Sequence, residues 1–396
     1  MNRLFVRLAG MIAIALFAGC NSGGESADPP VSVLAEAREN GVHLTFPMSS
    51  DVEYWVFFAP TSELTSTNFD KVSGGRVIAG AWSPVLVTGL VNGVTYYFTI
   101  NGRTGGGPGG PGTPLVSATP RLAGASWNAG TPIAGGELRG TAFGAVFVAV
   151  GANGAMFSSP DGASWTALTN VVSSDLNAAA FGSGNYLAAG AVGTMLVSTD
   201  AATWTQQATG TTNDLYAVAT NGVGTFVAAG ANGTVIVNTG SGIWTRADSG
   251  TTNSLYGVTY ANGRFVAVGA GGIALTSTDG TAWAPAVSQS TLDLKGVAYS
   301  NTAATFVAVG VAGTLVTSPD GLTWTRQPPV STKTLNSVVV GGQFVAAGNE
   351  GAVLTSTDGL TWTTVATGTT NHLYAIAYGS SHYAAVGASG TNLTAY

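Results

Sequence analysis

The stretch NSLYGVTYANGRFVAVGAGGIALTSTDGTAW, residues 253–283, shows how most of this chain is organised. Three runs rich in Val, Tyr, Phe, Thr and Ala are separated by the segments ANG, AGG and TDG. The first group of residues favours strands, whereas Asn-Gly, Gly-Gly and Asp-Gly favour tight turns. A fourth run begins after Trp283. The stretch therefore predicts four short antiparallel strands in succession.

The same unit recurs through residues 121–396. Its tryptophan returns at intervals of about 40 residues, at Trp127, Trp165, Trp204, Trp244, Trp283, Trp324 and Trp362. A second motif recurs out of step with it, as FVAVG at 147, 265 and 306, FVAAG at 226 and 344, YLAAG at 186 and YAAVG at 383. Four strands in a repeat of this length are typical of a β-propeller blade. We expect an all-β chain with a seven-bladed β-propeller over residues 121–396.

The two ends of this array are incomplete. RLAGASW at 121–127 resembles SPDGASW at 159–165 but has lost the aspartate. The last unit, 372–396, stops after three strand-like runs, before a tryptophan of its own. The residues after Trp127 can supply its missing fourth strand. We therefore expect the first and last segments to share one blade and close the ring.

The recurring S-x-D-G-x-x-W segment has a structural explanation. Ser and Asp side chains hydrogen-bond to the backbone of their own turn, Gly allows a positive φ, and Trp buries a large ring. The segment resembles the Asp-box, or BNR repeat, of sialidases and related propellers, with one residue fewer between Asp and Trp. Two copies deviate: Ala201 replaces the glycine in STDAATW, and NTGSGIW at 238–244 has no aspartate. We assign structural roles to Asp161, Trp165, Asp200, Trp204, Asp279, Trp283, Asp320, Trp324, Asp358 and Trp362.

The whole repeat is similar to the propellers of photosystem II assembly and stability factors and of their uncharacterised bacterial relatives. This resemblance covers residues 121–396 and implies a fold. It implies little about function, because one fold serves many functions.

A second region precedes the repeats. Residues 31–120 contain six strand-like runs, among them EYWVFFAP at 53–60 and TYYFTING at 95–102. LVNGVTYYF resembles the fibronectin type III signature, in which a leucine stands six residues before a tyrosine, here Leu90 and Tyr96. The resemblance implies a β-sandwich in which Tyr96 is the tyrosine-corner residue. Phe46 stands where that family usually has tryptophan.

The first twenty residues are typical of an export signal. Arg3 and Arg7 precede a short apolar run, which is followed by Ala18-Gly19-Cys20. The run is too short to span a bilayer. The segment resembles a bacterial lipoprotein signal, which implies cleavage after residue 19 and lipidation of Cys20. Residues 20–30 would form a flexible tether, and the protein would lie in the cell envelope, in the outer membrane by preference.

Composition excludes some partners and chemistries. The net charge is −6 and the basic residues form no cluster, so we expect no nucleic-acid partner. Cys20 is the only cysteine, and His43, His372 and His382 have no metal-ligand spacing, so we expect no metal and no cofactor. We expect a monomer attached to the membrane by its lipid.

Candidate binding residues flank the leucine that opens the innermost strand of each blade. Glu137, Asp175, Asp214, Ser254, Asp293, Thr334 and His372 precede it, and Arg139, Asn177, Tyr216, Tyr256, Lys295, Asn336 and Tyr374 follow it. These positions vary in chemistry while their surroundings repeat, which is typical of a binding surface on a rigid scaffold. Our candidates are Arg139, Asp175, Asn177, Asp214, Tyr216, Tyr256, Asp293, Lys295, His372 and Tyr374. The alternative is that the tyrosines only pack beside the channel.

Two classes of function fit this pattern. A non-catalytic module would dock an unidentified envelope protein or polypeptide, in adhesion or in complex assembly. A carbohydrate-active propeller, sialidase-like or otherwise glycoside-hydrolysing, would need two carboxylates within reach of one bond, and Asp214 and Asp293 come from blades two apart. We find no complete catalytic constellation and favour the binding module.

Overall fold

A computed structural model describes residues 24–134 and 136–396 of the chain. The signal sequence and Cys20 lie outside the described residues. The chain divides into two compact units: the first ends at Thr119, and the second takes in Pro120–Tyr396 together with Ala37–Val42 and Thr88–Gly93. Both units are built from β-strands. In the part that the structure describes, no helix has the length and apolar character needed to cross a bilayer.

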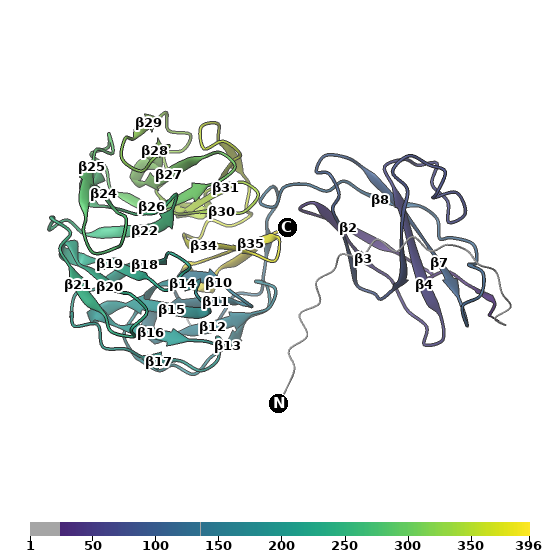
Figure 1. The fold of residues 1–396 in the computed structure, drawn as a ribbon, viewed down its shortest axis with the longest axis horizontal. Helices are drawn as coiled ribbons and strands as arrows, with labels where there is room; N and C mark the ends of the chain where they lie inside the picture. The colour runs from purple at the N-terminus through teal and green to yellow at the C-terminus, as the bar shows by residue number, and fades with distance from the viewer. Residues whose placement is uncertain (1–23, 135) are drawn as a thin grey trace. The chain divides into compact units, whose positions relative to one another are not determined.

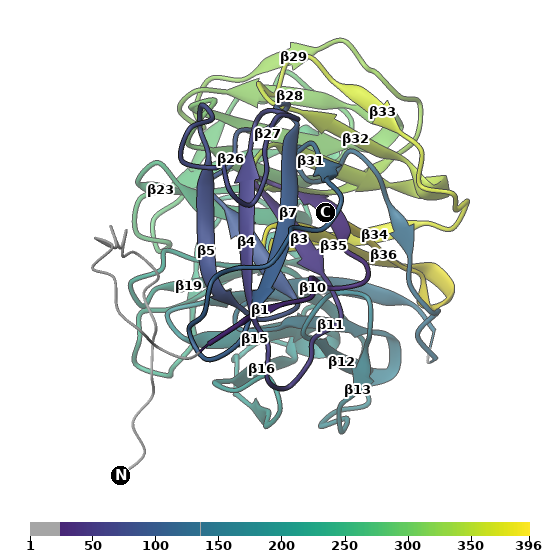
Figure 2. The ribbon, with the colours of Figure 1, turned by 90° about the vertical axis from the view of Figure 1, so that its right-hand side faces the viewer.

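The first unit contains two antiparallel sheets. Its strands are β1 (Ser26–Ala27), β2 (Leu34–Arg38), β3 (Gly41–Thr45), β4 (Glu53–Ala59), β5 (Arg76–Ala81), β6 (Val85–Thr88), β7 (Tyr96–Arg103) and β8 (Val116–Ala118). One sheet has the order β1-β7-β4-β5, in which β5, β4 and β7 are seen side by side in Figure 2, and β8 also pairs with β7. The other sheet has the order β2-β3-β6. Tyr54, Val56, Phe98 and Ile100 from β4 and β7 are buried.

Two of these strands were not expected from the sequence. β5 lies in RVIAGA, where only two strongly strand-forming residues stand among small ones. β1 falls inside the expected flexible tether, but Ser26 and Ala27 pair with Arg103 and Gly102 of β7. The tether prediction is therefore wrong for these two residues, because an open edge of β7 offers them backbone hydrogen bonds.

The second unit consists of four-stranded antiparallel sheets, seven of them among the described residues. The first three are β10 (Leu138–Phe143), β11 (Phe147–Gly151), β12 (Met156–Ser159), β13 (Thr166–Ala167); β14 (Leu176–Gly182), β15 (Asn185–Gly190), β16 (Met195–Ser198), β17 (Thr205–Gln206); and β18 (Leu215–Thr220), β19 (Phe226–Gly230), β20 (Val235–Asn238), β21 (Thr245–Ala247). The next two are β22 (Leu255–Ala261), β23 (Arg264–Gly269), β24 (Ala274–Ser277), β25 (Ala284–Ala286); and β26 (Leu294–Ser300), β27 (Thr305–Gly310), β28 (Leu315–Ser318), β29 (Thr325–Gln327). The last two are β30 (Leu335–Val340), β31 (Phe344–Gly348), β32 (Val353–Ser356), β33 (Thr363–Val365); and β34 (Leu373–Gly379), β35 (His382–Gly387), β36 (Asn392–Ala395) with β9 (Asn128–Ala129). We number these sheets one to seven in this order.

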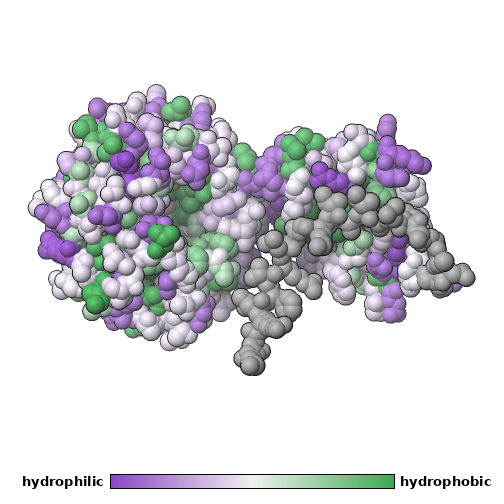
Figure 3. Space-filling view, viewed as in Figure 1, coloured by the Kyte–Doolittle hydropathy of each residue, from purple (hydrophilic) through white to green (hydrophobic). Residues whose placement is uncertain are grey.

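The sheets are arranged in a ring. The first strand of each sheet packs against the first strand of the next, from β10 to β34, and β34 packs against β10 (Figure 1). Every residue of the second strand is buried in β11, β19, β31 and β35. The hydrophobic clusters span neighbouring sheets, as where Val148 of β11 packs with Leu176 and Tyr186 of the second sheet. On the face seen in Figure 3, hydrophilic and hydrophobic residues are interspersed. Most of the apolar side chains of the second strands are buried between the sheets.

A short left-handed turn joins the second and third strands of every sheet. These 3₁₀ turns are η1 (Ala152–Gly154), η2 (Ala191–Gly193), η3 (Ala231–Gly233), η4 (Ala270–Gly272), η5 (Val311–Gly313), η6 (Asn349–Gly351) and η7 (Ala388–Gly390). The middle residue of each has φ of 53–64°. The last residue is glycine because a Cβ there, as at Gly154, would lie 2.0 Å from the carbonyl oxygen of Val172.

In five of the sheets, the turn between the third and fourth strands is held by hydrogen bonds of its own serine, aspartate and tryptophan. In the fifth sheet, Ser318 Oγ donates to Asp320 Oδ1 at 3.0 Å, and the Trp324 indole N–H donates to the carbonyl of Gly321 at 3.1 Å. Corresponding bonds occur at Asp161, Asp200, Asp279 and Asp358 with Trp165, Trp204, Trp283 and Trp362. The aspartates therefore serve the turn.

Backbone donors hold these carboxylates in the ionised form. The N–H groups of Thr203 and Ala202, together with the Ser198 hydroxyl, lower the pKa of Asp200 to about 2. The N–H groups of Thr361 and Leu360 likewise lower the pKa of Asp358. Hydrogen bonds to the charged form are one of the three general causes of such shifts.

The seventh sheet joins the two ends of the repeat region. β9 pairs with β36, with Asn128 opposite Thr394 and Ala129 opposite Leu393. Trp127 is buried, and its indole N–H donates to the carbonyl of Gly124 at 3.1 Å. The segment RLAGASW thus keeps the tryptophan bond of the intact turns without the aspartate. The pairing expected from the two incomplete ends is present.

This pairing predicts unequal effects of two deletions. Deleting residues 122–130 removes β9 and Trp127, and the cluster around Tyr383 and Leu393 would become exposed to water. The melting temperature of the second unit should then fall far more than after removal of residues 24–119. Thermal unfolding followed by tryptophan fluorescence measures both. Equal melting temperatures for the two truncated chains would contradict a closing role for β9.

Candidate functional site

A β-bulge places one side chain of each sheet at the centre of the ring. In every first strand the pairing register shifts directly after the opening leucine, as between Leu138 and Gly140. The residue in between has no partner in the ladder, and bulges of this kind redirect side chains. The seven residues are Arg139, Asn177, Tyr216, Tyr256, Lys295, Asn336 and Tyr374, which we call the channel ring.

The channel ring lines a central cavity of about 220 Å³, which is also lined by the two residues that follow each ring residue in its strand. Six of the predicted candidates, all except Asp175, Asp214, Asp293 and His372, belong to this lining. Asn336 also belongs to it, although we had not selected it as a candidate. Its register position, the residue after the leucine, was the signal that should have included it.

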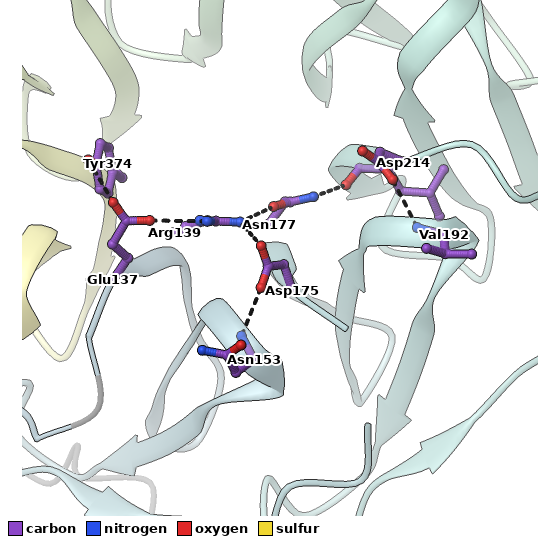
Figure 4. A network of polar contacts seen from close by, with 9 residues as sticks. Glu137, Arg139, Asn153, Asp175, Asn177, Val192, Asp214 and Tyr374 are labelled. Atoms are coloured by element: carbon purple, nitrogen blue, oxygen red, sulfur yellow. Dashed lines mark hydrogen bonds and ion pairs between the residues drawn. The ribbon is translucent and has the colours of Figure 1, made fainter. Parts of the chain in front are cut away.

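Arg139 is the centre of a polar network on one side of the ring (Figure 4). Its guanidinium donates to Glu137 Oε2 at 3.0 Å, to Asp175 Oδ2 at 2.6 Å and to Asn177 Oδ1 at 3.3 Å. Burial would lower the pKa of Arg139, but the bonds to the two carboxylates outweigh it and raise the pKa. The Tyr374 hydroxyl lies 3.5 Å from Glu137 Oε1. A cation is thus held at the rim by acidic side chains of two sheets.

A second cation lies in the fifth sheet. Lys295 Nζ is 3.2 Å from Asp293 Oδ2 and 3.5 Å from the centre of the Tyr256 ring. The Tyr256 and Tyr216 rings lie 5.7 Å apart, inclined at 42°. Burial, followed by the charge of Asp214, raises the pKa of Tyr216. The Tyr216 phenol therefore stays neutral at physiological pH, and the ring presents phenols beside the Lys295 cation.

The two asparagines of the ring connect neighbouring sheets. Asn177 Nδ2 donates to the carbonyl of Leu215 at 3.1 Å, and Asn336 Nδ2 donates to the carbonyl of Leu373 at 2.8 Å. Each bond joins the bulge residue of one sheet to the opening leucine of the next sheet. The asparagines therefore help to fix the shape of the channel mouth.

The residues before the leucines hold the turn of the preceding sheet. Asp175 accepts a hydrogen bond from the N–H of Asn153, Asp214 from that of Val192, and Asp293 from that of Gly271, at 2.8–2.9 Å. Each donor is the residue at the left-handed position of its turn. In the seventh sheet His372 Nδ1 accepts the same bond from Glu350 at 3.0 Å. We call these four contacts the junction bonds. Four of the candidate binding residues thus have a structural contact that the sequence did not suggest.

The junction bonds bear on the carboxylates considered for glycoside hydrolysis. Asp214 and Asp293 each use one oxygen to accept a turn N–H, and the second oxygen of Asp293 accepts from Lys295. The N–H of Gly271, followed by Lys295, lowers the pKa of Asp293. That carboxylate is therefore held as an anion, whereas a general acid in this chemistry needs a raised pKa.

The sheets, their closed ring and the central channel define the second unit as a β-propeller. No protein-family model and no curated protein sequence match this chain. Solved structures do match it. YCF48 from Cyanidioschyzon merolae has a TM-score of 0.56 and 18% identity, over 68% of this chain and 98% of that chain. A structure described as YCF48 bound to D1 peptide has a TM-score of 0.56 and 20% identity, over 68% and 96%.

A different type of propeller matches as well. The WD40 β-propeller domain of Doa1 has a TM-score of 0.57 and 11% identity, over 69% of this chain and 97% of that chain. Identities this low show a shared fold. The propeller resembles YCF48 in its architecture, and what it binds has to be argued from its own residues.

The turns suggest a test of backbone strain. Val192 and Asn232 occupy the left-handed position with the same φ of 54° and ψ of 37°. A β-branched residue is strained there, whereas Asn tolerates it. Val192→Asn should raise the free energy of unfolding by about 1 kcal/mol, and Asn232→Val should lower it by about as much. Denaturant titration of both variants measures this. Changes of the same sign would refute the strain argument.

Proposed function

We propose that the propeller docks a polypeptide partner over the channel ring and acts in the assembly of a protein complex. The observation that carries the proposal is the ring itself, in which two cations, three phenols and two amides from seven sheets face one cavity. A polypeptide segment offers carbonyl acceptors, N–H donors and acidic side chains. Cations, phenols and amides can bind all of these groups.

The structural neighbours support this choice. YCF48, whose propeller this one resembles, is described in one structure as bound to D1 peptide. The match covers 68% of this chain and 96% of that chain, so a similar scaffold binds a peptide. This chain differs from it at about four residues in five, so the choice of partner has to be argued from the residues of the channel ring.

The ion pairs of Arg139 and Lys295 affect how tightly the ring can bind a partner. Arg139 and Lys295 are each held by acidic side chains, and their positions are fixed before any partner arrives. Groups that are already ordered lose less conformational entropy on binding. A partner carboxylate can share Arg139 or Lys295 with these acids, and Tyr216 and Tyr256 offer flat apolar surface between the two cations.

The finer architecture is part of the proposal. We propose a seven-bladed propeller of the Asp-box type, a fibronectin III-like domain over residues 31–120 as a spacer, and a lipid on Cys20 that anchors a monomer in the envelope, in the outer membrane. The two-sheet topology of the first unit and the motif ending at Cys20 support these assignments. In fractionated cells, Cys20→Ser should move the protein from the membrane to the soluble fraction, and its retention in the membrane would contradict the anchor.

Crosslinking in the full chain tests the docking site. A photo-reactive amino acid at position 216, in envelopes of the host, should form a covalent adduct with a polypeptide. Arg139→Gln combined with Lys295→Gln should lower the yield at least about tenfold, because both rim cations are lost. Mass spectrometry of the adduct identifies the partner.

The matched control is Arg246→Gln combined with Arg326→Gln. These arginines lie on the outer strands β21 and β29, are exposed, and carry the same total charge. The control should leave the yield unchanged. Equal losses in both double variants, or no adduct at position 216, would reject the channel ring as the docking site.

A further inference from the structure

One turn of the propeller departs from the packing of all the intact Asp-box turns. In those turns the residue after the aspartate of S-x-D-G-x-x-W lies between its own sheet and the preceding sheet. A Cβ on Gly280 would lie 2.7 Å from Val227 and 3.3 Å from Val237 of the third sheet. The same close approach occurs at Gly162, Gly321 and Gly359, each against the preceding sheet. The glycine therefore fills the space between adjacent sheets.

The third sheet lacks this insertion. Its turn, NTGSGIW at 238–244, has Gly240 in place of the aspartate and Ser241 in place of the glycine. Asn238 Oδ1 accepts the N–H groups of Gly240 and Gly242 at 3.0 and 3.3 Å. Ser241 and Gly242 are exposed, and a Cβ on Gly242 would meet nothing within 4 Å. The turn points outward because it has no aspartate to accept hydrogen bonds from its backbone N–H groups.

The displaced turn leaves a cavity of about 280 Å³ between the second and third sheets. Leu187 and Val197 line it, and they hold the same register positions in the second sheet as Val227 and Val237 in the third. The cavity therefore occupies the space that glycine fills elsewhere. Phe226 lines it too and is 8% exposed, whereas the equivalent Phe265 is fully buried. We call this cavity the inter-sheet pocket.

The tryptophan of this turn has also changed its partner. The Trp244 indole N–H donates to Gln207 Oε1 of the second sheet at 2.8 Å, instead of to a carbonyl of its own turn. This contact fixes the Gln207 amide at the pocket, with its NH₂ group as a donor. Asn185 donates to the carbonyl of Ser183, so its own oxygen remains as an acceptor.

The lining decides the class of ligand. Leu187, Val197, Phe226 and Trp244 are apolar or aromatic, and Ser183, Asn185, Gln207 and Asn238 carry neutral donors and acceptors. No charged side chain belongs to the lining, among the residues that the structure describes. The volume is near the lower end of the range for small-molecule sites. We propose that the inter-sheet pocket binds an uncharged saccharide, whose hydroxyl groups meet the amides and whose C–H faces pack on the aromatic wall.

The experiment uses the full chain and a panel of neutral sugars: glucose, galactose, mannose, N-acetylglucosamine and their disaccharides. Saturation-transfer NMR detects binding and calorimetry measures it. At least one sugar should bind with a Kd tighter than about 10 mM. The triple variant N238S/G240D/S241G restores an intact box, STDGGIW, which should insert its glycine and weaken binding at least about tenfold.

Two single variants complete the test. Gln207→Leu removes the amide at the pocket and should also weaken binding at least about tenfold. Gln206→Leu, at the neighbouring exposed position of β17 outside the lining, should leave it unchanged. Three results would overturn the proposal: no sugar binds, the restored box binds as well as the parent, or both glutamine variants lose binding equally. Failure of the channel ring variants bears only on the docking proposal.

Discussion

The fold depends on one constraint: the sheets of the propeller are apolar on both faces, so every sheet needs two neighbours. The second strands are buried along their length, and the clusters that bury them belong to pairs of sheets. A row of such sheets would leave one apolar face open to water at each end. The short pairing of β9 with β36 avoids this, because it completes the seventh sheet, which packs against the first. The few backbone hydrogen bonds between β9 and β36 therefore decide whether two large apolar faces are exposed. Burial of each large apolar side chain on these faces contributes about 1.5–3 kcal/mol to the free energy of folding.

The repeat made much of the propeller predictable. Strand order, the role of Asp320 and Trp324, and the pairing of the two incomplete ends follow from local motifs that recur in phase. The sandwich was less predictable at β5, because RVIAGA offers little strand-forming signal and forms a strand through its pairing with β4. Non-local pairing of this kind overrides local preference. The seven channel ring positions could be found from the sequence, but the bulge that directs them inward could not.

The contacts of the candidate site were the least predictable part. Asp175 was predicted as a candidate binding residue, yet one of its oxygens accepts the N–H of Asn153 and the other accepts from Arg139. Asn153 and Arg139 belong to the first sheet, whereas Asp175 stands at the start of the second. The packing of one sheet against the next brings these residues together, and the sequence alone does not show that packing. The inter-sheet pocket has a different origin. The missing aspartate in NTGSGIW is visible in the sequence, but the volume it leaves depends on the glycine packing of the other sheets.

The junction bonds all point the same way around the ring, from the turn of one sheet to a side chain at the start of the next. A single repeat therefore does not contain its own complete set of stabilising contacts: it supplies the acceptor for the sheet before it and depends on the sheet after it. Moving a repeat to another place in the chain would separate Val192 from Asp214, even if each sheet kept its shape. Because the donor is always a backbone N–H, a transplanted repeat would form an equivalent bond only where the next sheet opens with a suitable acceptor, as Asp175, Asp214, Asp293 and His372 do here.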